Sequence, residues 1–282
     1  MSNITTILIS HDKGDEKIAL ELKLFLEDVF QNVSVFVSGR DLIGGQTWIE
    51  QIKHRLKTSE VIISLLTSKS LDNNWVYFES GAGFTEDKTI PILTDNLKLE
   101  SLVPPMSLLQ ARLLSESGIG MLIKDITQKL NLQREPKHYP SIKDLISRVE
   151  KILRQESAAK LKSMIPIKEI APNAKRQWIY EENCLVHDFI IDKKYEITVD
   201  TYFYLDRTEI QLFDRSGSKE FVINTMCKTE NFLPKPLNQY KVRGSRLIFQ
   251  AFESTEKLDN IANSLSDLLV RIEGYFKKTS NN

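Results

Sequence analysis

The sequence lacks several features that mark particular classes of protein. Its two cysteines, Cys184 and Cys227, are too few for a disulfide framework and have no metal-ligand spacing between them, so a reducing compartment is expected. The net charge is zero, with 38 basic and 38 acidic residues, and 17 of each lie from Ile165 onward. Because neither half carries a basic excess, a nucleic-acid partner is not indicated.

Long apolar runs are also missing. No apolar run approaches the roughly 20 residues needed to cross a bilayer, and residues 1–4 contain neither a basic region nor a signal-like stretch. We therefore expect a cytoplasmic protein without a membrane partner. Its 282 residues, 41% hydrophobic and 27% charged, have an ordinary globular composition and a length that favours two domains.

The first half alternates between strand-like and helix-like segments. Short apolar or β-branched runs at residues 5–10, 33–37, 61–66 and 89–93 are typical of strands, and a fifth is predicted near 110–114. Apolar residues three and four apart predict helices between them. Pro91 cannot donate to a ladder, which predicts that the fourth strand lies towards an edge. The alternation predicts an α/β fold with a parallel, doubly wound sheet.

Three segments are expected at one edge of this sheet. Ser10–Asp12 follows the first strand, the glycine-rich segment Gly39–Gly45 follows the second, and a helix with Trp75 and Glu79 follows the third. In doubly wound folds, ligands bind outside the carboxyl ends of the strands. We therefore expect these segments to converge on a ligand site.

The helix after the third strand carries the candidate acid. Asn73 or Asn74 can cap its start, and Trp75 and Glu79 are four residues apart, so they share one helix face. A carboxylate beside an aromatic ring at the mouth of a sheet suits a sugar or a nucleotide. The alternative is that Trp75 packs on the sheet while Glu79 points to water.

The same segments carry a family resemblance. Residues 7–11, Ile-Leu-Ile-Ser-His, resemble box 1 of a TIR domain, and residues 39–45 resemble its BB loop, with Gly44 where that loop usually has proline. Residues 75–79, Trp-Val-Tyr-Phe-Glu, are similar to the W-x-x-x-E segment of enzymatic TIR domains. The motifs occur in the family's order, each after a strand. Residues 4–132 thus resemble a bacterial immune-type TIR domain, which implies a flavodoxin-like fold.

The resemblance implies cleavage of the nicotinamide–ribose bond of NAD+, with ADP-ribose or a cyclic variant as the second product. Oxidised nicotinamide is positively charged and leaves without protonation, so the second carboxyl group that a glycosidase uses as acid is not needed. A fixed anion that stabilises the oxocarbenium-like centre is sufficient. Glu79 is the implied catalytic residue. NAD+ is the substrate, and neither a metal nor a cofactor is expected.

Further residues are candidates for substrate contact: Ser10, His11, Arg40, Asp41, Trp48 and Trp75. Ser10 and His11 are expected to line the nucleotide site through backbone groups, although His11 can equally close a turn. Arg40 approaches the diphosphate or a neighbouring subunit in one interpretation and forms a salt bridge with Asp41 or another acidic residue in the other.

The tryptophans and glycines have structural alternatives. Trp48 starts its helix, a position more typical of packing than of stacking, and Trp75 either bounds the nicotinamide pocket or is buried against the sheet. Gly81 and Gly83 each lower helix stability by about 1 kcal/mol relative to alanine. Their small size favours close packing of the helix on the sheet.

The second half has a different pattern and no family resemblance. A polar connector with Pro136 and Pro140 leads into an amphipathic helix. Strands are predicted at 177–180, 185–191, 195–205, 209–213, 220–226 and 246–252. A closing helix follows over 258–276. We expect an α+β domain with a mainly antiparallel sheet, and we interpret Lys241, Arg243 and Arg246 as parts of a solvated loop.

The resulting organisation has three parts. Residues 1–135 are expected to be the NAD-cleaving TIR domain, 136–164 a linker helix and 165–282 a sensing or assembly domain. The corresponding function is an antiphage defence effector that forms homo-oligomers through its TIR domains. An unidentified ligand or protein partner of residues 165–282 would activate it.

Two other functions fit the same sequence. A non-enzymatic TIR adaptor would assemble through its BB loop, and a nucleoside deoxyribosyltransferase-like enzyme would share the α/β core and a glutamate. Glu79 separates the first of these from the NAD-cleaving enzyme, because an adaptor has no need for that acid.

Overall fold

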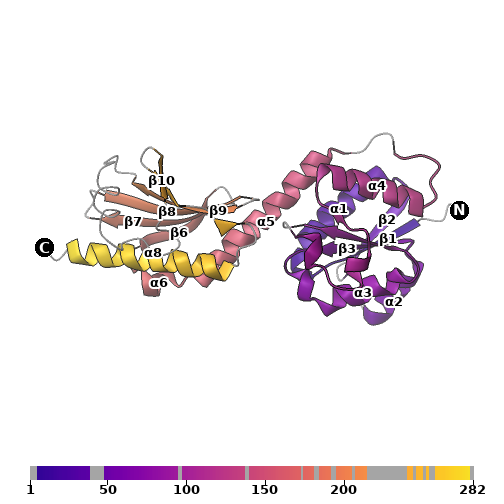
Figure 1. Cartoon of the computed structure of the whole chain (residues 1–282), viewed down its shortest axis with the longest axis horizontal. Helices are drawn as coiled ribbons and strands as arrows, with labels where there is room; N and C mark the ends of the chain where they lie inside the picture. The colour runs from indigo at the N-terminus through magenta and orange to yellow at the C-terminus, as the bar shows by residue number, and fades with distance from the viewer. Residues whose placement is uncertain are drawn as a thin grey trace. The chain divides into compact units, whose positions relative to one another are not determined.

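The structure is a computed structural model. It describes residues 5–38, 48–94, 97–136, 140–172, 174–180, 184–191, 195–204, 207–214, 240–243, 246–249, 252–253 and 258–279. The chain divides into two compact units, residues 1–152 and 153–282, and the division falls within helix α5 (Ile142–Met164) (Figure 1). This division does not test the three domain ranges predicted from the sequence, 1–135, 136–164 and 165–282, which stay predictions. Among the described residues, no helix has the length and apolar character of a membrane span.

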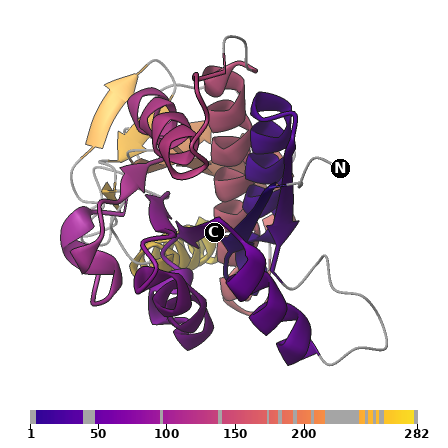
Figure 2. The ribbon, with the colours of Figure 1, turned by 90° about the vertical axis from the view of Figure 1, so that its right-hand side faces the viewer.

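The first unit contains a parallel sheet with helices on both faces, as predicted. The sheet has the strand order β2-β1-β3-β4-β5. Its strands are β1 (Thr5–Ser10), β2 (Val33–Val37), β3 (Val61–Leu66), β4 (Thr89–Leu93) and β5 (Arg112–Leu113). Its helices are α1 (Glu16–Val29), α2 (Trp48–Thr58), α3 (Asn74–Phe84) and α4 (Glu116–Lys129). Helices α1 and α4 cover one face, and α2 and α3 cover the other (Figures 1 and 2).

The central strands form the core because both of their faces are covered. All six residues of β3 are buried, as expected for a strand inside a doubly wound sheet. Strand β4 is next to the edge strand β5, which agrees with the prediction made from Pro91, a residue with no N–H to donate to a neighbouring strand. Its outer neighbour β5 is two residues long and pairs with Ile92 and Leu93, so no β5 residue pairs with Pro91.

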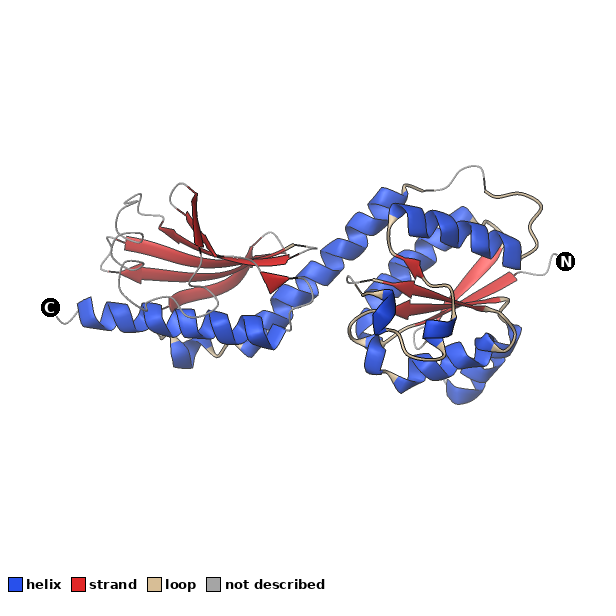
Figure 3. Ribbon diagram, viewed as in Figure 1, coloured by secondary structure: helices blue, strands red, loops and turns tan. Residues whose placement is uncertain are grey.

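The second unit contains an antiparallel sheet, as predicted. Its strand order is β10-β11-β9-β8-β7-β6, and β12 pairs with β9. The strands are β6 (Ala174–Tyr180), β7 (Cys184–Ile191), β8 (Tyr195–Phe203), β9 (Arg207–Asp214), β10 (Tyr240–Arg243), β11 (Arg246–Phe249) and β12 (Phe252–Glu253). Helix α8 (Leu258–Thr279) runs along this sheet, and α6 (Ile167–Ile170) is a single turn (Figure 3).

One apolar face of this sheet packs with α8 into a common core. The sheet contributes alternate residues such as Val199 and Leu212, and α8 contributes Leu265 and Leu269. The solvated loop predicted around Arg243 and Arg246 is wrong, because these residues pair with each other in the β10–β11 ladder. The strand predicted at 220–226 lies outside the described residues.

Candidate functional site

The position of Glu79 follows from where α3 begins. Strand β3 ends at Leu66, a short 3-10 turn follows (Ser70–Asp72), and α3 starts at Asn74. The Asn73 side chain accepts a hydrogen bond of 2.9 Å from the backbone N–H of Trp75, which confirms Asn73 as the N-cap. Glu79 therefore lies in the second turn of a helix that starts at the carboxyl edge of the sheet.

The carboxylate of Glu79 is enclosed by neutral hydrogen-bond donors. Its exposed fraction is 0%. The Ser10 hydroxyl donates to Oε2, and the indole Nε1 of Trp75 donates to Oε1 at 2.9 Å. The alternative in which Glu79 points to water is thus wrong. Ser10 contributes its side chain, where the sequence had indicated backbone groups.

Burial dominates the electrostatics of Glu79. Loss of solvent raises the pKa of this carboxyl group above its ordinary value, and hydrogen bonds from Ser10, Trp75 and Ser38 and the charge of His11 offset the rise in part. Ser38 directly follows β2 and is buried. The ends of β1 and β2 and the helix after β3 therefore converge on one carboxylate. Sequence reasoning missed Ser38, although its place at a strand end was a usable signal.

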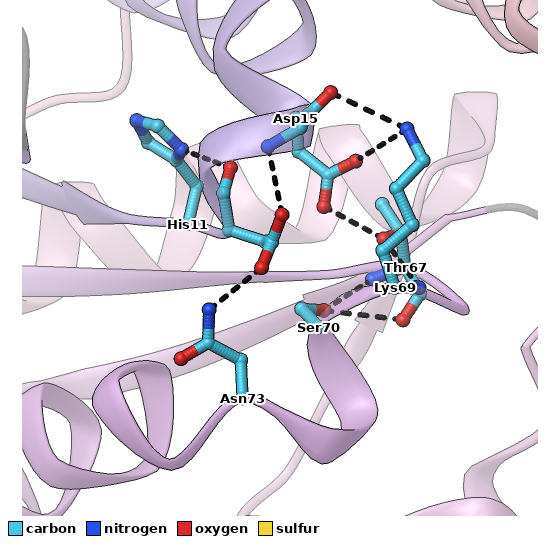
Figure 4. Close-up of polar contacts among 8 residues, drawn as sticks. His11, Asp15, Thr67, Lys69, Ser70 and Asn73 are labelled. Carbon is cyan, nitrogen blue, oxygen red and sulfur yellow. Dashed lines mark hydrogen bonds and ion pairs between the residues drawn. The ribbon is translucent and has the colours of Figure 1, made fainter.

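His11 and Asp12 follow β1, and Asp12 connects the end of this strand to the start of α3. Its Nδ1 lies 2.6 Å from the backbone oxygen of Asp12. The Asp12 carboxylate accepts hydrogen bonds from the backbone N–H of Gly14 at 2.7 Å and from Nδ2 of Asn73 at 2.6 Å. The Asn73 side chain that caps α3 is thereby held by the loop after β1 (Figure 4).

A second buried carboxylate, Asp15, lies in the same polar network. Its exposed fraction is also 0%. Thr67 Oγ1 donates to it at 2.7 Å, and Lys69 Nζ lies 3.3 Å from its other oxygen (Figure 4). Burial raises the pKa of Asp15, and the Thr67 hydrogen bond and the Lys69 charge oppose the rise. No motif in the sequence marks Asp15, Thr67 or Lys69, although each lies within five residues of the end of β1 or β3.

Trp75 combines a polar and an apolar contact. While its Nε1 binds Glu79, its ring packs against Phe78, with 5.2 Å between the ring centroids. A recess of about 340 Å³ adjoins it and is lined by Asp12, Lys69, Asn73, Asn74 and Trp75. A ligand can therefore reach the first turn of α3 from solvent.

The remaining predicted site residues are not placed at this site. Arg40 and Asp41 lie outside the described residues, and Trp48 begins α2 without a described side chain.

Gly83 packs closely against β3 and β4, as predicted, whereas the position of Gly81 is open. Within the described part of the chain, no three acidic, histidine or cysteine side chains gather as a metal site would require.

A family model agrees with the fold of the first unit, and two solved structures are similar to the chain. Two solved structures of a metazoan TIR-STING receptor from C. gigas, one in complex with 2′,3′-cGAMP, are 13% and 15% identical to the chain, with TM-scores of 0.34 and 0.35. They match 68% and 70% of this chain and 69% of each receptor chain. No protein of curated function matches. The family model of the TIR domain matches residues 7–118, and this part of the chain is therefore a TIR domain.

Proposed function

We propose that the chain is an NAD+ glycohydrolase in which Glu79 stabilises the transition state. The observation that supports this most is the fully buried carboxylate where β1, β2 and the helix after β3 meet, held by Ser10 and Trp75. A folded protein gains nothing from enclosing an acid among neutral donors, because desolvation disfavours its charge. An adaptor would have no use for this arrangement.

The chemistry of the reaction fits a site with one acid. Nicotinamide departs as a neutral molecule from a cationic ring, so no proton has to be supplied to it. Positive charge then develops on the ribosyl centre, and a fixed anion stabilises it more strongly where water is excluded. The two donors from Ser10 and Trp75 orient the Glu79 carboxylate before substrate arrives, so little reorganisation is needed during the reaction.

Access to Glu79 supports a regulated activity. Because the side chain is closed to solvent, the ribose must open its surroundings on binding. A resting form with low activity is the expected consequence. Self-association of TIR domains would shift the population towards the open form. The size of this shift is limited by how much more tightly the open form binds a neighbouring TIR domain than the closed form does.

The second unit provides the expected control of that association. In this proposal, residues 165–282 bind a ligand or a protein partner and drive the TIR domains together. The biological role is a cytoplasmic antiphage effector that depletes NAD+ or makes a cyclic ADP-ribose signal.

Release of nicotinamide tests the proposed activity. The purified chain is incubated with NAD+ over a range of protein concentrations, and nicotinamide is measured by chromatography beside Glu79→Gln. Glu86→Gln is the matched control, since Glu86 lies in the exposed turn after α3. Nicotinamide release by the wild type and by Glu86→Gln, but not by Glu79→Gln, is expected. Equal release by a folded Glu79→Gln protein, or none by the wild type at any concentration, would overturn the proposal.

A further inference from the structure

The imidazole of His11 has a buried nitrogen for which the described part of the chain provides no hydrogen-bond partner. His11 is 7% exposed, and its Nε2 makes no hydrogen bond with any part of the chain that the structure describes. Buried polar atoms are nearly always paired, so an unpaired imidazole nitrogen one residue from Ser10, which binds Glu79, needs an explanation.

The other ring nitrogen determines the protonation of this one. Nδ1 lies 2.6 Å from the backbone oxygen of Asp12, and a carbonyl oxygen only accepts hydrogen bonds. Nδ1 therefore carries the proton, and in the neutral ring Nε2 has a free lone pair. Hydrogen bonds from Gly14 and Asn73 hold the Asp12 side chain. The residue whose backbone oxygen orients the imidazole ring is therefore itself held in place. The ring lies apart from the Asp15, Thr67 and Lys69 side chains (Figure 4).

His11 is also close to the candidate catalytic acid. The preceding residue, Ser10, donates to Glu79, and a positive charge on His11 lowers the pKa of the Glu79 carboxyl group. An oriented imidazole beside an anion, with its free nitrogen lacking a partner, is the arrangement of a general base.

We propose that His11 is a second catalytic residue, whose Nε2 accepts the proton of the water that captures the ribosyl cation. This inference rests on the proposed NAD+ cleavage. After nicotinamide has left, the water oxygen forms a bond to the ribosyl carbon, its O–H bond breaks, and the proton moves to Nε2. The resulting imidazolium returns the proton to solvent when ADP-ribose leaves. His11 acts in the capture step and not in the departure of nicotinamide.

A nucleophile without a proton provides a selective test. The nitrogen of 3-acetylpyridine attacks through its lone pair and loses no proton, so its capture of the cation needs no base. Water must lose a proton and does need one. The ratio of ADP-ribose to the acetylpyridine exchange product therefore reports on His11 separately from the rate of nicotinamide release.

The experiment compares the full-length wild type with His11→Asn in NAD+ and 3-acetylpyridine. Asparagine keeps an N–H near the Nδ1 position that can donate to Asp12 and removes Nε2. His54→Asn is the control, because His54 is exposed on α2. We expect the product ratio to fall at least tenfold in His11→Asn and to be unchanged in His54→Asn.

The outcomes separate this inference from the proposed function. An unchanged ratio in folded, nicotinamide-releasing His11→Asn overturns the role of His11 and leaves the role of Glu79 intact. Absence of nicotinamide release from the wild type overturns the proposed function and this inference with it. If His11→Asn does not fold by circular dichroism, His11→Gln is measured instead, with the same expected fall and the same contrary result.

Discussion

Two carboxylates at the same edge of the sheet, Asp15 and Glu79, are both fully buried and differ in what surrounds them. Asp15 has the ammonium group of Lys69 at 3.3 Å together with the Thr67 hydroxyl. Glu79 has the Ser10 hydroxyl and the Trp75 indole, and none of the lysines and arginines in the described part of the chain pairs with it. In both groups burial raises the pKa, so desolvation alone does not distinguish them.

The difference indicates which acid is structural. The ammonium group of Lys69 balances the charge of Asp15. The pair also joins the loop after β1 to the segment after β3, and this structural link is a sufficient reason for the burial of Asp15. Glu79 has no lysine or arginine partner among the described residues. When it is ionised, a developing positive charge on a substrate would therefore interact with a carboxylate that no such cation already balances.

The largest expected effect is on catalysis by Glu79→Gln. Loss of the anion should reduce nicotinamide release by a factor on the order of a hundred or more, equivalent to about 3 kcal/mol. The fold should persist, because an amide can accept from Trp75 while its NH₂ donates to the Ser10 oxygen. Urea unfolding of both proteins measures this, and a markedly lower stability of the variant would mean that Glu79 is structural, like Asp15.

The pH dependence of stability sharpens the same comparison. A carboxyl group with a raised folded-state pKa binds more protons in the folded than in the unfolded protein, between its unfolded and folded pKa values. Its stabilising contribution is present below the unfolded value and is lost as pH rises through the folded value. Glu79→Gln should thus gain stability relative to wild type across that window. Equal stability differences at low and neutral pH would contradict the raised pKa.

Asp15→Ala should reverse the balance of effects seen in Glu79→Gln, with a structural and not a catalytic cost. It leaves the Thr67 hydroxyl and the Lys69 ammonium group without their carboxylate, which we expect to reduce the free energy of unfolding by about 2 kcal/mol. Below the unfolding transition, nicotinamide release should change less than tenfold. A hundredfold loss of activity in stable Asp15→Ala would remove the distinction between the two acids.

Trp75→Phe tests whether the indole N–H sets the charge of Glu79. The aromatic ring is kept, whereas a donor that lowers the pKa of Glu79 is lost, so that pKa should rise further. Because activity requires ionised Glu79, the acidic limb of the rate profile should shift to higher pH, so the loss of activity should grow as the pH falls. Phe78→Leu is the control for ring packing. An unshifted acidic limb would assign Trp75 to packing alone.

The smallest expected effects come from two glycines of α3. An alanine Cβ at Gly83 would lie 2.5 Å from Thr89 Oγ1 and 2.6 Å from Ile62 Cδ1, so we expect a loss of roughly 1 kcal/mol and reduced activity as α3 moves from the sheet. At Gly81 nothing lies within 4 Å, and alanine should stabilise the helix by up to about 1 kcal/mol with activity retained. Thermal unfolding of the pair measures both, and equal shifts would show that α3 is not held closely by β3 and β4.

Periodicity in the sequence was sufficient to predict much of the fold. The buried strand at residues 61–66 and the N-cap at Asn73 are local properties, set by neighbouring side chains and backbone. The antiparallel second unit followed from alternation within each strand. The β10–β11 pairing around Arg243 and Arg246 was missed, because ladder partners depend on distant segments.

The sequence by itself determined the order of the elements, the capping of α3, the placement of Ser10 and His11 at the end of β1, and that of Glu79 in the helix after β3, since each depends on residues near in the chain. Only the tertiary structure decided that Glu79 is buried and held by Ser10, 69 residues away, and that Asp15 is paired with Lys69, 54 residues away. Burial and charge pairing depend on which strands become neighbours. That choice is made by packing over the whole sheet, and no local pattern in the chain records it.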